Sequence, residues 1–512
     1  MSQFKLLLRG SALRATETSI GIVLGFITLP LMTNSLGADL YGLWVLIGSV
    51  SAMMYLFDIG FASAVVQKIA HSVKLKDHGK TNSVISTALV IYSILSLIII
   101  LVITITAWLY NPEFSGLIST AEFKTILILS GLAIAIEFPS KAFAGLIQAH
   151  LRHDLAALYQ IVFKILSTTT IITLLLNGQK LLAIAIVNFA FSLLSTCAFV
   201  FVCRYVYKEM NISMKLVNKS VFKELYHYSA WAFLLDLNRM LKGRMDLFFI
   251  GSYISFAAVT VYYVGVRLVD YSATLLHKAL SVTLPTLSGH MAKQDYAALR
   301  KDLLLFNRIN TYAYSLAIIF FGFFGKIIIF VWLGRDFDYN AAYVILIITV
   351  IGRLSLVAID GYVTALYACN MHKFMLTNGI GETVVTAVML YVFLAMFGFG
   401  TLSVAIAIAA PIIVFRFLFL PFLCIRLLKI DRGLTLVWQS YRPILMAIVL
   451  APFMYLHSAL EPSFGVYELV VACSIMVVFL GFAFIELQPR EKALINRLTK
   501  RKFFNVGSEE AF

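Results

Sequence analysis

Long apolar stretches recur along the whole 512-residue chain, and they limit its possible folds more than any other feature of the sequence. A helix that crosses a bilayer needs about 20 apolar residues. Fourteen stretches meet that need, and the sequence therefore predicts an all-α polytopic membrane protein with about 14 transmembrane helices. The expected spans are 13–35, 41–67, 82–109, 123–147, 155–176, 181–203, 226–251, 257–287, 303–333, 341–369, 374–397, 401–425, 441–458 and 466–487.

The composition excludes most other classes of protein. Residues of the AVILMFWYC set make up 61% of the chain and charged residues only 13%. A soluble domain of this composition would expose large apolar patches and aggregate. Fourteen spans also leave no room for a folded domain outside the membrane. The sequence contains no glycine-rich phosphate loop and no catalytic constellation, so we expect neither an enzyme nor a bound cofactor or metal.

Lysine and arginine alternate between the loops in the way that membrane topology requires. The predicted cytoplasmic loops, tails and span ends together carry 27 lysines and arginines, whereas the loops on the opposite side hold only Lys124, Lys180 and Arg335. Because cytoplasmic loops retain positive charge, both termini are predicted to be cytoplasmic. The same pattern accounts for most of the net charge of +15, so nucleic acid is not an expected partner.

Two pairs of weakly similar segments indicate an internal duplication. The segment Ala38–Trp44 is similar to Val259–Gly265, and Gln148–Arg152 is similar to Ala368–His372. In each case the partners lie six spans apart, which predicts two six-helix lobes related by a parallel repeat. The expected domains are an N-terminal lobe (1–204), a cytoplasmic linker (205–225), a C-terminal lobe (226–428), two additional helices (429–487) and a basic cytoplasmic tail (488–512).

Charged residues inside the spans are costly and therefore default to a functional hypothesis. Several have an opposite charge three or four residues away on the same helix and could form structural ion pairs, among them Glu137 with Lys141, Lys242 with Asp246, and Arg267 with Asp270. The seventh and eighth spans nevertheless carry a surplus of cations: Arg239, Lys242, Arg244 and Arg267 against Asp236, Asp246 and Asp270. A cavity with surplus positive charge suits an anionic ligand such as a phosphate, and a purely structural network is the alternative.

Three carboxylates lack a partner on their own helix: Asp58, Asp360 and Glu382. Each could bind a coupling proton or cation. Pairing with a cation on another helix is an equally weighted alternative.

Several short motifs resemble a known family. Leu36-Gly37 and Tyr41-Gly42-Leu43-Trp44, followed by Asp58-Ile-Gly60-Phe61, resemble the opening of Wzx-type O-antigen and exopolysaccharide flippases of the MATE-like (MOP) superfamily. Gly145-Leu-Ile-Gln148, Arg244-Met-Asp246, Tyr263-Val-Gly-Val-Arg267 and Pro285-Thr-Leu-Ser288 resemble later motifs of the family, in order. The resemblance covers the first twelve spans.

The resemblance implies a substrate and a way of handling it. The substrate would be an oligosaccharide linked through diphosphate to undecaprenol, moved from the cytoplasmic to the periplasmic leaflet by alternating access through a cationic central cavity. Arg244 and Arg267 match family motif positions and are candidate substrate-binding residues. Arg239, Lys242, Arg14 and Lys68 are candidates on the charge argument alone.

The resemblance also implies a cellular location, an oligomeric state and partners. We expect a monomer in the bacterial inner membrane, surrounded by membrane lipids, with a polysaccharide polymerase and a chain-length regulator as further partners.

Three alternatives remain at this stage. A cation-coupled multidrug or small-metabolite antiporter of the same superfamily would have a cavity dominated by carboxylates, which the surplus of cations disfavours. A non-transporting scaffold for polysaccharide assembly would have all its intramembrane charges paired. A membrane-embedded glycan polymerase would need a large periplasmic loop, and the sequence has none.

Overall fold

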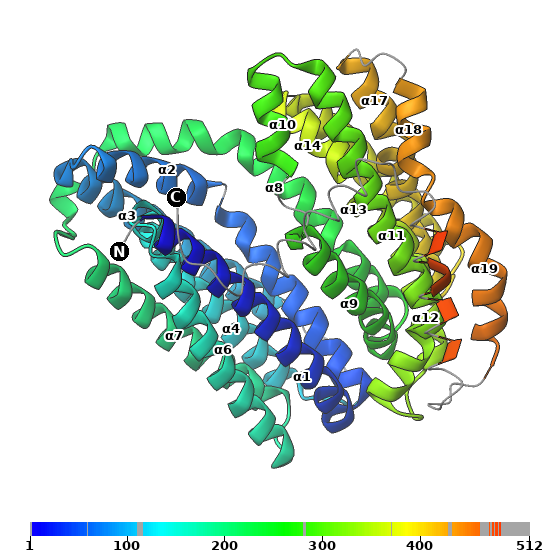
Figure 1. Ribbon diagram of the computed structural model, residues 1–512. Coiled ribbons are helices and arrows are strands. Elements are labelled where there is room, and N and C mark those ends of the chain that lie inside the picture. Colours follow the sequence, from blue (N-terminus) through cyan, green and yellow to red (C-terminus); the bar gives the residue numbers. More distant parts are fainter. Residues whose placement is uncertain are drawn as a thin grey trace, which may run out of the picture. The chain divides into compact units, whose positions relative to one another are not determined.

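The computed structural model describes residues 3–58, 60–109, 116–279, 283–369, 371–428 and 433–460, with 470–471, 474–475, 477–479 and 481–482. Within these ranges it does not describe the side chains of 3–8, 11, 226–236, 239–242, 279, 283–285, 292, 372 and 373. Every regular element in the described residues is a helix, which confirms the predicted all-α fold (Figure 1). The chain divides into two compact units, Met1–Tyr263 (unit 1) and Val264–Phe512 (unit 2).

The division falls inside one helix, α9 (Phe256–Ala279). It does not test the sequence repeat, so the two six-helix lobes and their boundaries stay a prediction. The other helices of unit 1 are α1 (Gln3–Met53), η1 (Met54–Asp58), α2 (Phe61–Lys74), α3 (His78–Leu109), α4 (Thr120–Glu137), η2 (Phe138–Phe143), α5 (Ala144–Ala149), α6 (His153–Leu176), α7 (Leu181–Val206), η3 (Met214–Leu216) and α8 (Lys219–Tyr253).

Unit 2 is built from shorter segments. They are α10 (Thr283–Ala292), α11 (Tyr296–Leu333), α12 (Tyr339–Arg353), α13 (Ser355–Ala358), α14 (Asp360–Ala368), α15 (His372–Tyr391), η4 (Val392–Met396), α16 (Thr401–Pro411), η5 (Ile412–Leu418), α17 (Phe419–Leu427), α18 (Gly433–Tyr441) and α19 (Ile444–Ser458). The elements η4 and η5 are π-helical, whereas η1, η2 and η3 are 3₁₀-helical.

The described residues contain 10 helical stretches long and apolar enough to cross a membrane. The first, Ala12–Asp58, holds the predicted span 13–35 and the predicted span 41–67 only as far as Asp58, and each of the other nine corresponds to one predicted span. The predicted seventh and eighth spans correspond to α8 and to α9 with the start of α10. Neither is among the 10 stretches, and both carry the surplus cations noted above. The last predicted span, 466–487, and the basic tail fall mostly outside the described residues.

Short polar side chains begin three of the long helices. Ser119, Asp295 and Asp338 each accept a hydrogen bond from the backbone N–H three residues later, at 3.1, 2.9 and 3.0 Å. These bonds satisfy one of the donors that a helix start leaves without an intrahelical acceptor. They fix the first residues of α4, α11 and α12.

The helix α1 contains the first predicted span and the start of the second, joined at Gly37. This glycine has φ 78° and ψ 166°, a conformation that is essentially confined to glycine. The ribbon of α1 reverses direction within its length (Figure 1). The break explains how a 51-residue helical stretch can cross the membrane twice.

Replacing Gly37 by alanine is expected to destabilise the protein by about 1–3 kcal/mol. A Cβ at Gly37 would meet no heavy atom within 4 Å, so the cost comes from the backbone conformation alone. Gly48, in the regular part of α1, also has open space around it. Because alanine is the better helix former, Gly48→Ala is expected to leave the melting temperature of the purified protein unchanged or to raise it. Equal melting temperatures for Gly37→Ala and the wild type would contradict this account.

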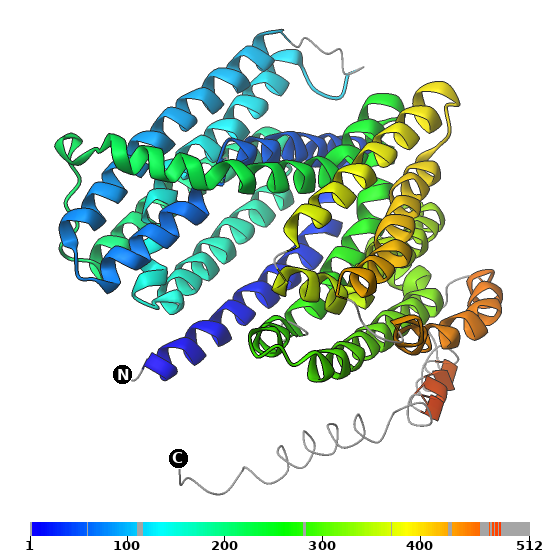
Figure 2. The ribbon, with the colours of Figure 1, turned by 90° about the horizontal axis from the view of Figure 1, so that it is seen from above.

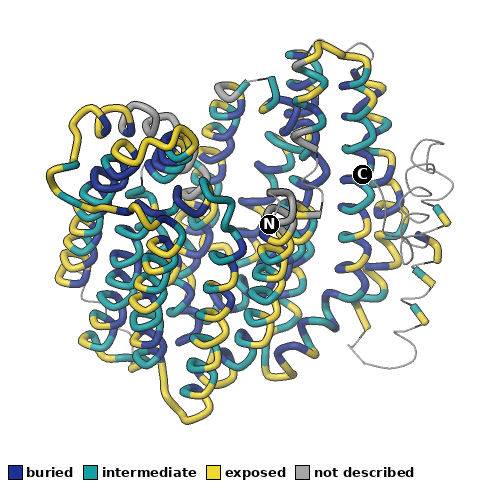
Figure 3. The backbone as a smooth tube through the Cα atoms, turned by 60° about the vertical axis from the view of Figure 1, so that its left-hand side comes forward, coloured by how far each residue is buried: buried dark blue, intermediate teal, exposed yellow. Residues whose placement is uncertain are grey.

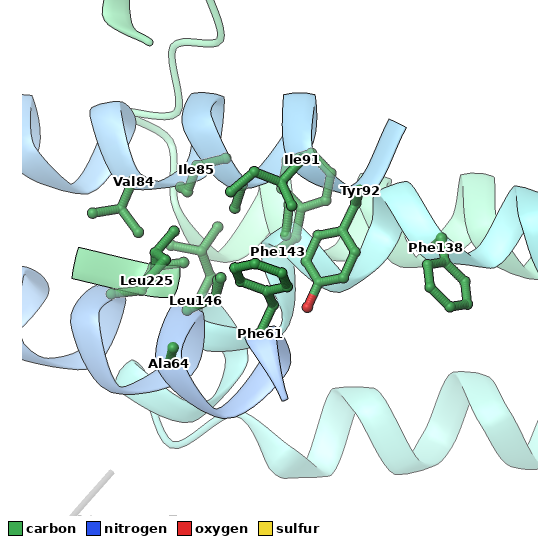
Figure 4. Close-up of a cluster of buried hydrophobic side chains, with 14 of the residues drawn as sticks. Phe61, Ala64, Val84, Ile85, Ile91, Tyr92, Phe138, Phe143, Leu146 and Leu225 are labelled. Carbon is green, nitrogen blue, oxygen red and sulfur yellow. The ribbon is translucent and has the colours of Figure 1, made fainter. Parts of the chain in front are cut away.

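Two 3₁₀ segments interrupt the spans of unit 1. The segment η1 lies inside the predicted span 41–67, which was wrong as one continuous helix because α2 begins separately at Phe61. The segment η2 follows directly on α4 with Pro139 near its start. Proline lacks the N–H that would continue the α-helical hydrogen bonds. Beside these segments lies a core of buried side chains that includes Tyr92 of α3 and Phe138 of η2 (Figure 4).

The last residues of the predicted cytoplasmic linker, 219–225, form the start of α8, which packs against other helices of unit 1. Asn218 begins this helix by accepting a hydrogen bond from the N–H of Ser220 at 2.8 Å. The helix contacts α1, α2 and α3. Figure 2 shows α8, in green, crossing the blue helices of the same unit.

The outer faces of α6 and α7 remain apolar and exposed. Large side chains such as Leu166, Leu194 and Phe201 are 49%, 53% and 73% exposed. Figure 3 shows exposed segments along much of the backbone. In a membrane protein such a surface contacts lipid, because the hydrocarbon is as apolar as the side chains.

Candidate functional site

An ion pair joins the two 3₁₀ segments of unit 1. The Nζ atom of Lys141 in η2 lies 2.7 Å from Oδ2 of Asp58 at the end of η1. The other oxygen, Oδ1, accepts hydrogen bonds from the hydroxyl of Tyr92 at 3.0 Å and from the backbone N–H of Ala62 at 3.1 Å. Asp58 therefore has both a cation and neutral donors. This is the interhelical pairing that the sequence left open as the alternative to ion coupling.

The predicted pair between Glu137 and Lys141 does not form. In a 3₁₀ helix residues three apart share a face, so a residue four positions on is turned away by about a third of a turn. Since η2 begins directly after Glu137, Lys141 points to Asp58 instead. Its ammonium group lies over the rings of Phe138 and Tyr55, at 4.3 and 5.0 Å from their centroids, within the range of a cation–π interaction.

Glu137 is held by hydroxyl groups. Its Oε2 accepts a hydrogen bond from the hydroxyl of Tyr55 at 2.7 Å, and its Oε1 accepts one from Ser192 of α7 at 3.1 Å. Among the described residues no cation forms an ion pair with it. Tyr55 thus links Glu137 back to η1, the segment that also carries Asp58.

A polar cavity of about 540 Å³ lies inside unit 1, beside this network. Its walls come from α1, α4, η2, α6 and α7 and contain two carboxylates, two lysines and several hydroxyls and amides. The lining residues are Glu17, Ala133, Glu137, Ser140, Lys141, Tyr159, Gln160, Phe163, Lys164, Ser167, Asn188, Phe191, Ser192, Ser195, Thr196 and Phe199. A cavity with such walls can hold water and a small charged species within a membrane-spanning unit.

Arg244 stands apart from these pairs. It is half-buried in α8, and no described residue forms a hydrogen bond or ion pair with its side chain. The nearby Asp246 is only 2% exposed and accepts hydrogen bonds from the hydroxyl of Tyr262 at 3.0 Å and from the N–H of Leu247 at 2.9 Å. A guanidinium without a protein partner keeps its donors free for an anion.

The remaining predicted cations of unit 1 have different surroundings. Arg14 lies 2.5 Å from Nδ1 of His153. Lys68 of α2 pairs with Glu224 of α8 at 2.5 Å. The hydrogen bond from Lys68 and its charge hold the pKa of Glu224 below its usual range. Both partners of that pair are partly exposed, so it contributes little stability. The side chains of Arg239 and Lys242 lie outside the described residues, and so does the predicted pairing of Lys242 with Asp246.

Arg267 belongs to unit 2. Its guanidinium lies 4.7 Å from the ring centroid of Tyr271, one turn further along α9. Asp270, its expected partner, lies 3.5 Å from Arg353 of α12. The structure thus gives Asp270 a partner on another helix that the spacing along α9 did not predict.

The two other candidate coupling carboxylates also have partners on different elements. Asp360, at the start of α14, lies 3.9 Å from Nδ1 of His277 in α9. Glu382 of α15 has a fully buried side chain and lies 2.6 Å from Nε of Arg416, inside the π-helical segment η5. Ion coupling by Asp58, Asp360 or Glu382 stays a prediction.

Unit 2 contains an apolar groove of about 590 Å³ between α11, α12, η5 and α19. Its lining includes Ile318, Val344, Phe417 and Met454 and contains no charged side chain. Such a lining suits an apolar chain and disfavours a charged head group.

Sequence reasoning did not single out Tyr92, Ser192 or His277 as neighbours of these carboxylates. Tyr92 and Ser192 lie 34 and 55 positions from their partners, and no local spacing connects them.

The sequence from residue 31 to 342 matches the family model Polysacc_synt_3, described as polysaccharide biosynthesis protein. The chain belongs to this family. The predicted family resemblance is thereby confirmed. None of the curated proteins matches the sequence.

Solved structures share the fold of this family member. The lipid II flippase MurJ in an inward closed conformation has a TM-score of 0.70 at 13% identity, over 92% of this chain and 98% of that chain. An inward-facing multidrug resistance MATE transporter of the MOP superfamily has a TM-score of 0.61 at 15% identity. The match covers 82% of this chain and 99% of that chain. A MOP superfamily transporter from Pyrococcus furiosus has a TM-score of 0.54 at 13% identity, and the match covers 84% of this chain and 98% of that chain. The binding pocket of that transporter is described as reversed in polarity. At these identities the likeness establishes the MOP fold. Family and fold together support a flippase or transporter role.

Proposed function

We propose that the protein flips oligosaccharide repeat units linked through diphosphate to undecaprenol, from the cytoplasmic to the periplasmic leaflet, for surface polysaccharide synthesis. Alternating access is the proposed mechanism, and the transport involves no covalent chemistry. The polysaccharide-biosynthesis family supports the substrate class, and the likeness to a lipid II flippase is consistent with a lipid-linked one.

The half-buried Arg244, which has no partner among the described residues, carries the proposal. A charged side chain within a membrane helix is expensive unless it gains a partner or water. A diphosphate offers several oxygens whose spacing matches the guanidinium fork bidentately. A cationic drug, the substrate expected for a multidrug antiporter, would instead be repelled by Arg244.

The other candidate cations are proposed to assist. Arg267 lies on α9, and Arg239 and Lys242 share α8 with Arg244. Arg14 and Lys68 lie at the predicted cytoplasmic ends of their spans, where the substrate would be collected. Their present partners are a histidine and a partly exposed glutamate, which a diphosphate could replace at modest cost.

The proposed setting is the bacterial inner membrane, with both termini in the cytoplasm. The lipid-linked oligosaccharide and the surrounding lipids are the proposed direct partners of a monomer. A polymerase and a chain-length regulator are proposed to act on the product.

Deleting the protein from its host tests this function. We expect loss of the surface polysaccharide together with accumulation of undecaprenyl-linked repeat units, because the units would be made and not moved. Reintroducing the wild-type chain should restore both. Unchanged polysaccharide and lipid pools in a host with no second flippase would contradict the proposal, and a drug-efflux assay would then test the antiporter.

A further inference from the structure

The polar cavity of unit 1 is lined by a cluster of aromatic rings as well as by hydrogen-bonding groups. Tyr159 and Phe163 of α6 and Phe199 of α7 belong to its lining. The ring centroid of Tyr159 lies 5.5 Å from that of Phe199 and 6.3 Å from that of Phe163. Glu137 and Asn188 are among the polar groups that line the same cavity. A sugar matches both kinds of surface, because its hydroxyls form hydrogen bonds and the C–H bonds of its ring faces pack on aromatic rings.

The helix α6 separates this cavity from the lipid-facing surface of unit 1. Leu158, Val162 and Leu166 share one face of the helix and are 48%, 45% and 49% exposed. Gln160 and Lys164, one turn apart on the opposite face, are also exposed, and both line the cavity. The exposed side chains of α6 are thus apolar on one face and polar on the face that lines the cavity. A polar ligand therefore fits the cavity better than the acyl chain of a membrane lipid.

The charges around the cavity disfavour an anion. Lys141 pairs with Asp58 at 2.7 Å. Lys164 lies against α1, because a Cβ at its glycine contact would collide with the lysine side chain, and α1 also carries Glu17. Counted with Asp58, the three carboxylates outnumber the two lysines. A phosphate or a uronic acid would therefore be repelled, whereas Glu137, which pairs with no cation among the described residues, can accept hydrogen bonds from neutral hydroxyls.

Two polar side chains of α7 have unused hydrogen-bonding capacity in the cavity. The Oγ1 atom of Thr196 is buried and has no hydrogen-bond partner among the described residues. The side-chain amide of Asn188 likewise forms no hydrogen bond with a described residue. A buried hydroxyl without a partner costs free energy that a ligand hydroxyl can recover. An amide offers donors and an acceptor side by side, which matches neighbouring hydroxyls on a sugar ring.

We propose that this cavity binds one neutral pyranose, a hexose or an N-acetylhexosamine. Glu137 accepts hydrogen bonds from its hydroxyls, Asn188 and Thr196 form further hydrogen bonds with them, and one face of the sugar ring packs on Tyr159 and Phe199. The cavity volume of about 540 Å³ is within the range of small-molecule sites. That this sugar is part of the transported oligosaccharide rests on the proposed function, whereas sugar binding itself does not.

Saturation-transfer NMR of the purified full-length protein in lipid nanodiscs tests sugar binding without a lipid-linked substrate. The probes are the methyl glycosides of glucose, galactose, mannose and N-acetylglucosamine, with methyl glucuronide as the anionic probe. We expect at least one neutral glycoside to be saturated above the level in empty nanodiscs, and the glucuronide to stay at that level. Saturation of none of the neutral glycosides would overturn the proposal, and so would equal saturation of the glucuronide.

Two matched pairs of variants locate the binding site. Asn188→Ala should weaken the affinity for the bound glycoside about 3- to 10-fold through lost hydrogen bonds. Asn177→Ala, at the exposed end of α6, should leave the affinity unchanged. Phe199→Leu should also weaken binding because it removes a ring from the cavity, whereas Phe201→Leu changes a side chain that is 73% exposed and should have no effect. Wild-type affinity in both Asn188→Ala and Phe199→Leu would contradict this placement of the sugar.

Liposomes that contain the protein and a lipid-linked unit with the bound sugar connect the site to transport. Asn188→Ala should flip this unit about 3- to 10-fold more slowly than the wild type, and Asn177→Ala should flip it at the wild-type rate. Equal rates for Asn188→Ala and the wild type would overturn the role of the cavity in transport. If the wild type does not flip the unit at all, the proposed function fails, while the NMR result still decides whether the cavity binds a sugar.

Discussion

Replacing Arg244 by alanine is expected to lower the rate of lipid-linked oligosaccharide translocation by about 10- to 100-fold. A hydrogen bond to a charged group contributes about 1.5–3 kcal/mol, and each 1.4 kcal/mol corresponds to a factor of ten. No described residue forms a hydrogen bond or ion pair with the Arg244 side chain. The alanine variant should therefore lose contacts to the ligand without breaking an interaction within the protein. The measurement is surface polysaccharide and undecaprenyl-linked pools, normalised to the amount of protein in the membrane.

Two further variants make the Arg244 result specific. Arg244→Lys keeps the charge and loses the planar fork, so we expect an intermediate rate. Arg335→Ala removes an exposed arginine from a loop predicted to be periplasmic and should behave as the wild type. Normal polysaccharide in Arg244→Ala at normal protein levels would exclude a role in substrate binding.

The largest effect on stability is expected at the pair between Glu382 and Arg416. The Glu382 side chain is fully buried, and that of Arg416 is 20% exposed. Removing one partner of a buried pair leaves an uncompensated charge and costs about 3–5 kcal/mol. Arg416→Met should therefore lower the melting temperature of the purified protein strongly, or reduce its amount in the membrane.

The double variant Glu382→Met with Arg416→Met provides the matched control. Replacing both charges by apolar side chains of similar size is often neutral or stabilising, so the double variant should recover most of the stability. If it also transports normally, Glu382 is not needed for ion coupling. A double variant as unstable as Arg416→Met alone would show that the pair is not the cause of the loss.

The membrane fold followed from the sequence because each span has to satisfy its own backbone hydrogen bonds and face hydrocarbon. Length, apolarity and the alternation of lysine-rich loops are local properties, and they predicted the positions of α3, α6 and α7 within a few residues. Gly37 was part of a predicted loop, and its positive φ allows the chain to reverse there.

The ion pairs could not be predicted from the sequence, because the partner of each charged residue is set by helix geometry and by contacts between distant segments. The expected pair of Glu137 with Lys141 assumed α-helical spacing, and the 3₁₀ segment η2 changed which face Lys141 occupies. Pro139, near the start of η2, lacks the backbone donor of an α-helix and is the local signal of this change. The pairing of Glu382 with Arg416 joins residues 34 positions apart, and no short-range pattern encodes it.

The most direct test of the central claim is a flipping assay with the purified protein in liposomes. Undecaprenyl-diphosphate-linked repeat units are placed in the outer leaflet, and their protection from a membrane-impermeant glycosidase is followed over time. We expect protection to develop faster with the wild-type protein than in protein-free liposomes, and about 10- to 100-fold more slowly with Arg244→Ala than with the wild type. Equal protection with and without the wild-type protein would contradict the assignment of this chain as a lipid-linked oligosaccharide flippase.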